Sequence, residues 1–114
     1  MLFGAVVLAT AWIAHGIFAH LRAKQRAVAE LESRTRAALD APGGLPNHPI
    51  EVRSAAAVEP RAESEPCRIC GGRLHTESHD VVPLGSTTLR RVHLRCGSCG
   101  RPSELFFRLR EAPN

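Results

Sequence analysis

Hydrophobic residues crowd the N-terminal end of the chain. Residues 2–19 read LFGAVVLATAWIAHGIFA and contain no Asp, Glu, Lys or Arg. A surface helix of a soluble protein would show a polar face, and this stretch shows none. A helix of this length spans about 27 Å, which is close to the hydrocarbon thickness of a bilayer. The pattern therefore predicts a single transmembrane helix that anchors the protein through residues 1–21.

The first basic side chains come directly after this stretch, at Arg22, Lys24 and Arg26. Positively charged residues next to a span stay in the cytoplasm. We therefore expect a single-pass membrane protein with its N-terminus outside and its C-terminal domain in the cytoplasm. A cleaved signal peptide is the alternative, but such peptides carry their basic residues before the apolar stretch.

Good helix formers dominate the next segment, residues 22–40, which reads RAKQRAVAELESRTRAALD. They predict a juxtamembrane helix that continues the anchor. Its apolar residues fit fewer than three heptads, so a solvated helix near anionic headgroups is a better interpretation than a coiled coil. Pro42, Gly43 and Gly44 are typical of a helix end.

No apolar period continues into residues 41–66, which read APGGLPNHPIEVRSAAAVEPRAESEP. Proline, glycine, alanine and charged residues dominate this segment. Such a composition is typical of a flexible chain. We expect a disordered linker that lets the domain beyond it range near the membrane surface.

Apolar and polar residues alternate over residues 87–95 and 104–110, which predicts strands there, and residues 74–84 can form a third strand before the turn at Gly85 and Ser86. Val92 and Leu94 share a parity with Cys96, which places them on one face. We expect a small all-β domain of about three short antiparallel strands over residues 67–110. The predicted core consists of Leu74, Val82, Leu84, Val92, Leu94, Leu105, Phe107 and Leu109.

Two Cys-x-x-Cys-Gly motifs flank the first two predicted strands, with 25 residues between Cys70 and Cys96. Two cysteines three positions apart on a tight turn can direct both sulfurs at one ion, so two such pairs are a strong metal signal. Four thiolates close a tetrahedral site and leave no position for water, which is typical of a structural site. Gly71 and Gly100 suit a turn position with positive φ. The predicted ligands are Cys67, Cys70, Cys96 and Cys99.

This region resembles the zinc ribbon fold group, whose two knuckles are Cys-x-x-Cys-Gly turns at the ends of β-hairpins. The resemblance implies one structural Zn²⁺, with Cys67 and Cys70 in the first knuckle and Cys96 and Cys99 in the second. It covers less than half of the chain. It implies no particular function, because zinc ribbons serve in transcription, translation, ubiquitin recognition and enzyme assemblies.

Other chemistry remains open for the same residues. Rubredoxins hold redox iron on similar turns, but they are acidic and rich in aromatic residues, whereas this domain is basic and has only Phe106 and Phe107. An exported domain could form two disulfides instead. Redox catalysis by one Cys-x-x-Cys needs a following helix, which the glycines disfavour. His75, His79 and His93 are expected on the surface.

Charge gives little support to a nucleic-acid interface. Eight Arg and five acidic residues follow residue 63, and a metal site with four thiolates removes two of the three excess positive charges. Arg68, Arg95 and Arg101 stand beside the ligands, so we interpret them as charge compensation. No nucleophile motif or phosphate-binding loop occurs, and we expect no enzyme activity. We expect a membrane-anchored zinc ribbon that binds a protein partner; a nucleic-acid-binding ribbon and a rubredoxin-like electron carrier are the alternatives.

Overall fold

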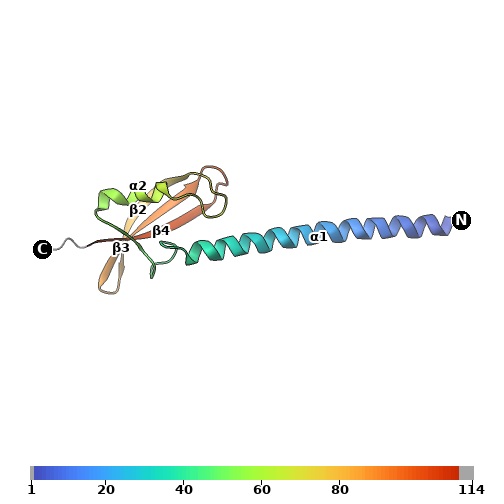
Figure 1. Cartoon of the computed structure of the whole chain (residues 1–114), viewed down its shortest axis with the longest axis horizontal. Coiled ribbons are helices and arrows are strands. Elements are labelled where there is room, and N and C mark those ends of the chain that lie inside the picture. Colours follow the sequence, from blue (N-terminus) through green and yellow to red (C-terminus); the bar gives the residue numbers. More distant parts are fainter. Residues whose placement is uncertain (1, 111–114) are drawn as a thin grey trace. The chain divides into compact units, whose positions relative to one another are not determined.

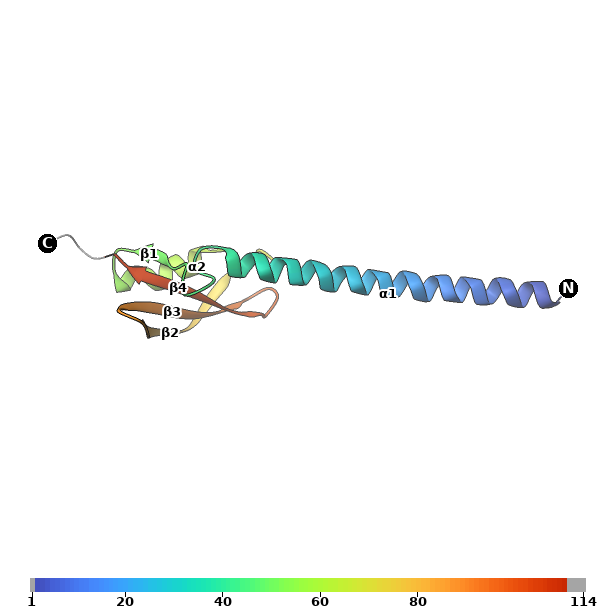
Figure 2. The ribbon, with the colours of Figure 1, turned by 90° about the horizontal axis from the view of Figure 1, so that it is seen from below.

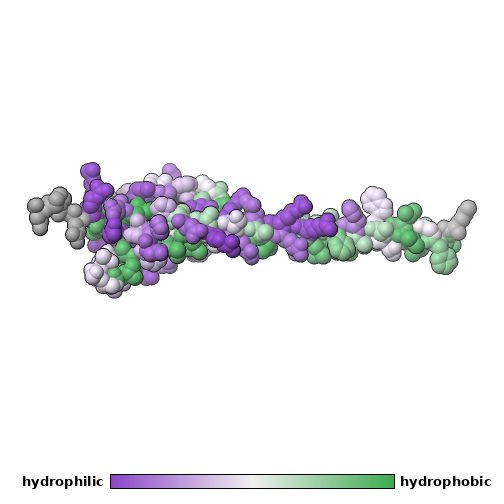
Figure 3. Space-filling view, turned by 60° about the horizontal axis from the view of Figure 1, so that its bottom comes forward, coloured by the Kyte–Doolittle hydropathy of each residue, from purple (hydrophilic) through white to green (hydrophobic). Residues whose placement is uncertain are grey.

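A computed structural model describes residues 2–110, which form two compact units. The first unit ends at Ser33 and the second begins at Arg34, and helix α1 (Leu2–Asp40) runs through both. No side chain of α1 is fully buried, and apolar side chains cover its N-terminal part (Figure 3). By length and composition this helix could cross a membrane. The predicted N-terminal helix is thus confirmed.

The second unit contains a four-stranded sheet, in which the strands follow the order β1-β4-β3-β2 (Figure 2). Strand β2 (Leu74–Leu84) pairs with β3 (Thr87–Cys96), and β3 pairs with β4 (Pro102–Leu109), both in antiparallel fashion. These are the three predicted strands, so the predicted fold class is confirmed. A short strand that was not predicted, β1 (Ile50–Val52), pairs in parallel with β4.

The prediction of a disordered linker over residues 41–66 is wrong. This segment contains β1, a 3₁₀ turn (Ala55–Ala57) and helix α2 (Val58–Ser64), which lies against β2 and β3 (Figure 1). Val58 and Ala62, four residues apart on one face of α2, are fully buried. Pro60 is tolerated because it lies in the first helical turn, where the backbone N–H has no partner within the helix. A few apolar residues are enough to order this segment because they pack against a face of the sheet.

The core lies between α2 and one face of the sheet. Of the predicted core, Val82 is half-buried, and Leu84 near the hairpin tip is 44% exposed. Two residues that alternation places on the opposite face, Leu89 and Phe106, are buried as well. The buried cluster consists of Ile50, Val52, Val58, Ala62, Cys67, Leu74, Val92, Leu94, Cys96, Leu105 and Phe107, and Leu109 packs against it partly buried.

The loop between α1 and β1 extends the edge of the sheet. The Phe106 N–H donates a hydrogen bond of 2.8 Å to the Gly43 carbonyl, and the Gly43 N–H donates to the His48 carbonyl. Gly43 has a φ of +82°, and a Cβ there would lie 2.8 Å from Cδ1 of Ile50. Only glycine combines this conformation with this close approach. The loop therefore fixes the end of α1 beside β4.

Candidate metal centre

Two five-residue turns carry the four cysteines. The first knuckle (residues 67–71) lies between α2 and β2, and the second knuckle (residues 96–100) connects β3 to β4. In both turns the closing glycine N–H donates to the carbonyl of the first cysteine, at 2.7 Å from Gly71 and 3.0 Å from Gly100. Both glycines have positive φ, +80° and +73°, which confirms the prediction for these positions.

The β2–β3 pairing brings the two turns together. Leu74, at the start of β2, stands opposite Cys96 at the end of β3. The Gly97 N–H donates a bond of 2.9 Å to the Arg73 carbonyl. The knuckles approach so closely that a Cβ on Gly72 would lie 2.6 Å from Oγ of Ser98 and 2.9 Å from Sγ of Cys96. Gly72 is therefore required by space, a role that the sequence pattern did not predict.

The four sulfurs converge on one point. All four Sγ atoms lie within 4.8 Å of one another; the Cys67–Cys99 pair is 3.8 Å apart and the Cys70–Cys96 pair 3.4 Å apart. Four thiolates at about 2.3 Å from a tetrahedral zinc ion would be about 3.8 Å apart, so the sulfur positions fit such an ion. The closest pair is much farther apart than the roughly 2 Å of a disulfide bond. The four predicted residues thus form a group that could hold a metal ion.

Hydrogen bonds distinguish the sulfurs from one another. Sγ of Cys96 accepts the N–H groups of Ser98 at 3.3 Å and Cys99 at 3.4 Å, whereas Sγ of Cys70 accepts only that of Gly72, at 3.3 Å. The Cys99 N–H, with help from Ser98 and against the effect of burial, lowers the pKa of Cys96 to about 6. Cys96 is therefore the first thiolate that the group offers to a cation.

The Cys70 thiol resists ionisation beside that thiolate. The Gly72 N–H acts to lower the pKa of Cys70, but the Cys96 sulfur, burial and the other two sulfurs outweigh it and raise this pKa to about 11. Like charges at such short distances disfavour each other. A divalent cation would relieve this repulsion, so metal binding and proton release are coupled.

The histidines make other contacts. Nδ1 of His79 lies 3.3 Å from a carboxylate oxygen of Glu59, and His93 lies between Asp80 at 3.7 Å and Glu104 at 3.3 Å. Among residues 2–110, the four cysteines are the only group of three or more such side chains whose ligand atoms are arranged so that they could hold one ion.

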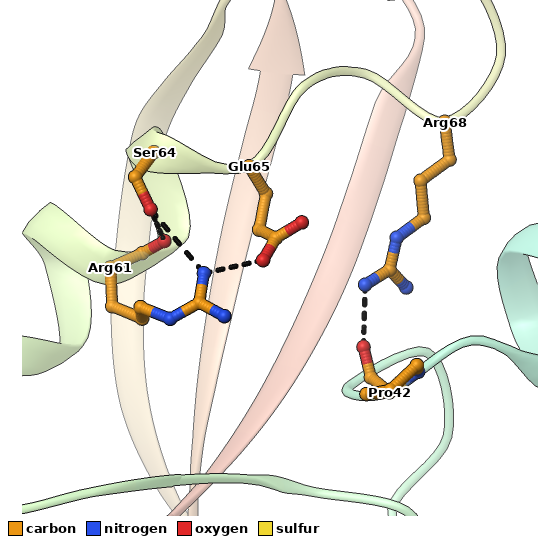
Figure 4. A network of polar contacts seen from close by, with 5 residues as sticks. All are labelled: Pro42, Arg61, Ser64, Glu65 and Arg68. Carbon is orange, nitrogen blue, oxygen red and sulfur yellow. Dashed lines mark hydrogen bonds and ion pairs between the residues drawn. The ribbon is translucent and has the colours of Figure 1, made fainter.

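Two of the arginines next to the cysteines in sequence, Arg68 and Arg95, form hydrogen bonds with other groups of the protein. Arg95 bonds the Gly100 carbonyl at 2.9 Å and a Glu77 carboxylate oxygen at 3.2 Å. Arg68 donates to the Ala38 carbonyl in the last turn of α1 and to the Pro42 carbonyl just beyond that helix; Figure 4 shows the second bond. That contact was not predicted, because nothing in the sequence places residues 38 and 68 together.

An apolar groove of about 340 Å³ lies beside the first knuckle. It is bordered by the C-terminal end of α1, the turn around Cys67 and the start of β4. Its lining includes Leu39, Ile69, Leu74, Pro102 and Leu105. Sequence alternation could not reveal it, because its walls come from three separate segments.

No protein-family model, curated protein or solved structure matches this chain. The assignment of the site therefore rests on the chain's own geometry: two glycine-closed turns that bring four cysteine sulfurs within ligating distance of one ion.

Proposed function

We propose that this protein is a membrane-anchored binding protein whose C-terminal domain is held together by one structural Zn²⁺. The observation that carries the proposal is the convergence of Cys67, Cys70, Cys96 and Cys99 to within 4.8 Å of one another. Zinc is the favoured ion because thiolate ligands in a tetrahedral, closed site are typical of structural zinc. With all four positions taken by protein, the site has no place for a substrate, which supports binding rather than catalysis.

The anchor is the N-terminal part of α1, which is apolar for long enough to cross a bilayer. Arg22, Lys24 and Arg26 follow the apolar stretch, and the positive-inside rule favours a cytoplasmic domain. The reducing cytoplasm also keeps cysteines available as metal ligands. The proposed role is to present the zinc domain to a partner near the cytoplasmic face of the membrane.

A protein is the favoured partner class. The groove beside the first knuckle has a mostly apolar lining, and an apolar groove can receive the apolar face of a partner's helix. Several arginines that could contact nucleic acid are already paired with acids: Arg91 with Asp80, and Arg108 with Glu51. Their positive charge is therefore partly neutralised, which weakens the electrostatic attraction that nucleic-acid binding needs.

The metal content of the full-length protein, purified in detergent and reducing buffer without added metal, tests the proposal. We expect about one zinc per chain and none in Cys96→Ser. One iron per chain with a visible absorption band would instead favour electron transfer. Folded protein without metal and without free thiols would reject both the site and the cytoplasmic location.

Location and partner need separate tests. A C-terminal alkaline phosphatase fusion should be inactive, because that enzyme requires export; activity would contradict the cytoplasmic location. A photo-crosslinking residue at Leu39, which lines the groove, should give a discrete protein adduct in cells. The same residue at Ser64, on α2 and outside the groove lining, is the matched control. Retention of the protein on RNA or DNA at physiological salt would favour the nucleic-acid alternative.

A further inference from the structure

Two arginines connect the first knuckle to the C-terminal end of α1, both within the second unit. Nη1 of Arg34 donates to the Ile69 carbonyl at 3.0 Å. In the opposite direction, Nη1 of Arg68 donates to the Ala38 carbonyl at 3.1 Å, and its Nη2 donates to the Pro42 carbonyl (Figure 4). We refer to these three hydrogen bonds as the knuckle–helix clamp.

The clamp meets a need of the helix. The last four carbonyls of an α-helix have no N–H partner within the helix and form the negative end of its dipole. Helix α1 ends at Asp40, so the Ala38 carbonyl is one of them. The Arg68 guanidinium satisfies that carbonyl with a charged donor. Removal of the Arg68 side chain leaves the Ala38 carbonyl without this hydrogen bond.

The clamp also depends on the knuckle. Arg68 and Ile69 are the two residues between the ligands Cys67 and Cys70, so the turn around the ion directs both. Two backbone bonds close this turn, from the Gly71 N–H to the Cys67 carbonyl and from the Cys67 N–H to the Gly72 carbonyl, but only an isolated bridge between Pro66 and Arg73 flanks it. A metal bond to both cysteines would therefore strengthen a turn that no pair of long strands supports.

We propose that the first knuckle is a metal-dependent clamp that holds residues 34–42 against the domain. This inference rests on the proposed metal centre. With the ion bound, Arg68 and Ile69 are in place and the end of α1 is ordered. Without the ion, the turn relaxes, the three bonds are lost, and the connection between the anchor helix and the domain loosens. Metal occupancy thus determines how firmly the domain is attached to its anchor.

Amide hydrogen exchange on full-length protein in lipid nanodiscs tests the clamp. The reporting amides are those of Ala41 and Gly44, which donate at 3.0 Å to the carbonyls of Ala37 and Ala41. In the zinc-loaded protein, Arg68→Ala should speed exchange of this segment about tenfold, because a charge-assisted bond is lost. Exchange in β3 and β4 should stay slow and the zinc content should remain one per chain.

Arg61→Ala is the matched control. Arg61 is also an arginine close to the knuckle, but its bonds stay within α2 and its cap, to Ser64 and Glu65 (Figure 4). This variant should leave exchange of residues 38–44 unchanged. Arg34→Ala, which lies outside the knuckle, is the second test variant and should also speed exchange there. It keeps the test decisive if Arg68→Ala fails to fold.

Unchanged exchange of residues 38–44 in zinc-loaded Arg68→Ala and Arg34→Ala would overturn the clamp. Removal of zinc from the wild type with a chelator should speed exchange of this segment, and protection that survives chelation would also overturn it. Failure of the metal centre looks different, because wild-type protein would then take up no zinc at all. The metal content of each sample therefore separates the two failures.

Discussion

The two knuckles share a backbone but differ in what supports them. Each is closed by a glycine of positive φ whose N–H returns to the first cysteine's carbonyl. The second knuckle joins two adjacent antiparallel strands, β3 and β4, so its ends are fixed by ladder hydrogen bonds. The first follows α2 and is flanked only by an isolated bridge between Pro66 and Arg73, and it receives a hydrogen bond from the distant Arg34 side chain.

One sulfur from each knuckle also differs in its backbone hydrogen bonds and in its pKa. Cys96 in the second knuckle accepts two backbone N–H groups and has its pKa lowered to about 6, whereas the pKa of Cys70 in the first rises to about 11. Of this sulfur pair, the second knuckle carries the more acidic thiol, whereas the first knuckle receives a hydrogen bond from the distant Arg34. Identical motifs in a sequence need not be equivalent sites.

The largest expected effect comes from removal of one ligand in either knuckle. Cys96→Ser and Cys70→Ser should both lose the metal, and with it folding free energy on the order of 10 kcal/mol. Metal analysis and circular dichroism of the full-length variants measure both losses. Retention of one zinc per chain by Cys70→Ser alone would show that the first knuckle contributes less than a full half-site.

The next largest effect comes from a methyl group at Gly72, directly after the first knuckle, compared with one at Gly97 in the second knuckle. The Cβ of Gly72→Ala would lie 2.6 Å from Oγ and 2.7 Å from Cβ of Ser98, which forces the two knuckles apart. The Cβ of Gly97→Ala would meet only the His75 ring, at 3.0 Å, and that side chain can move. Competition with a chromogenic chelator should show a large loss of zinc affinity for Gly72→Ala and a small one for Gly97→Ala. Equal affinities would contradict the close approach.

Truncation of a buried valine in α2 and of another in β3 tests whether α2, the helix before the first knuckle, is packed as firmly as the sheet. Val58 in α2 and Val92 in β3 are both fully buried. Each change to alanine should reduce the free energy of unfolding by about 2 kcal/mol, from lost burial and the cavity left behind. Chemical denaturation of the zinc-loaded variants measures this cost. A neutral Val58→Ala would mean that residues 50–64 are a tether after all.

The smallest effect concerns the hairpin that leads to the second knuckle. Arg91 donates a hydrogen bond to Asp80 across β2 and β3, which lowers the pKa of Asp80. Because the folded state favours the ionised form, this contribution to stability is present above the ordinary Asp pKa of about 3.9 and is lost as the pH falls through the lowered value. Asp80→Asn should therefore unfold with a weaker pH dependence below about pH 4 than the wild type. Identical profiles would show that the pair contributes nothing.

Short-range rules carried much of the prediction. The uncharged apolar stretch predicted the helix from residue 2, because a helix that is apolar on all sides can be identified from its sequence alone. Alternation predicted β3 and β4 to within two residues, since the side chains of a half-buried strand must alternate, and the turn before Thr87 placed β2. The two motifs predicted the four cysteines of the site, because a five-residue turn brings its own two sulfurs together and the strands between the motifs can pair as a hairpin.

Long-range contacts decided the rest. The sequence could not show that Ile50, Val52, Val58 and Ala62 are buried, since so few apolar residues are ordered only by the sheet that they cover. It could not show that Arg68 would reach the end of α1, because 30 residues separate it from Ala38. By itself the sequence determined the apolar helix, the strands β2, β3 and β4 and the two cysteine turns, because each follows from neighbours along the chain. The tertiary structure alone decided what supports each knuckle, because those partners meet only when the chain has folded.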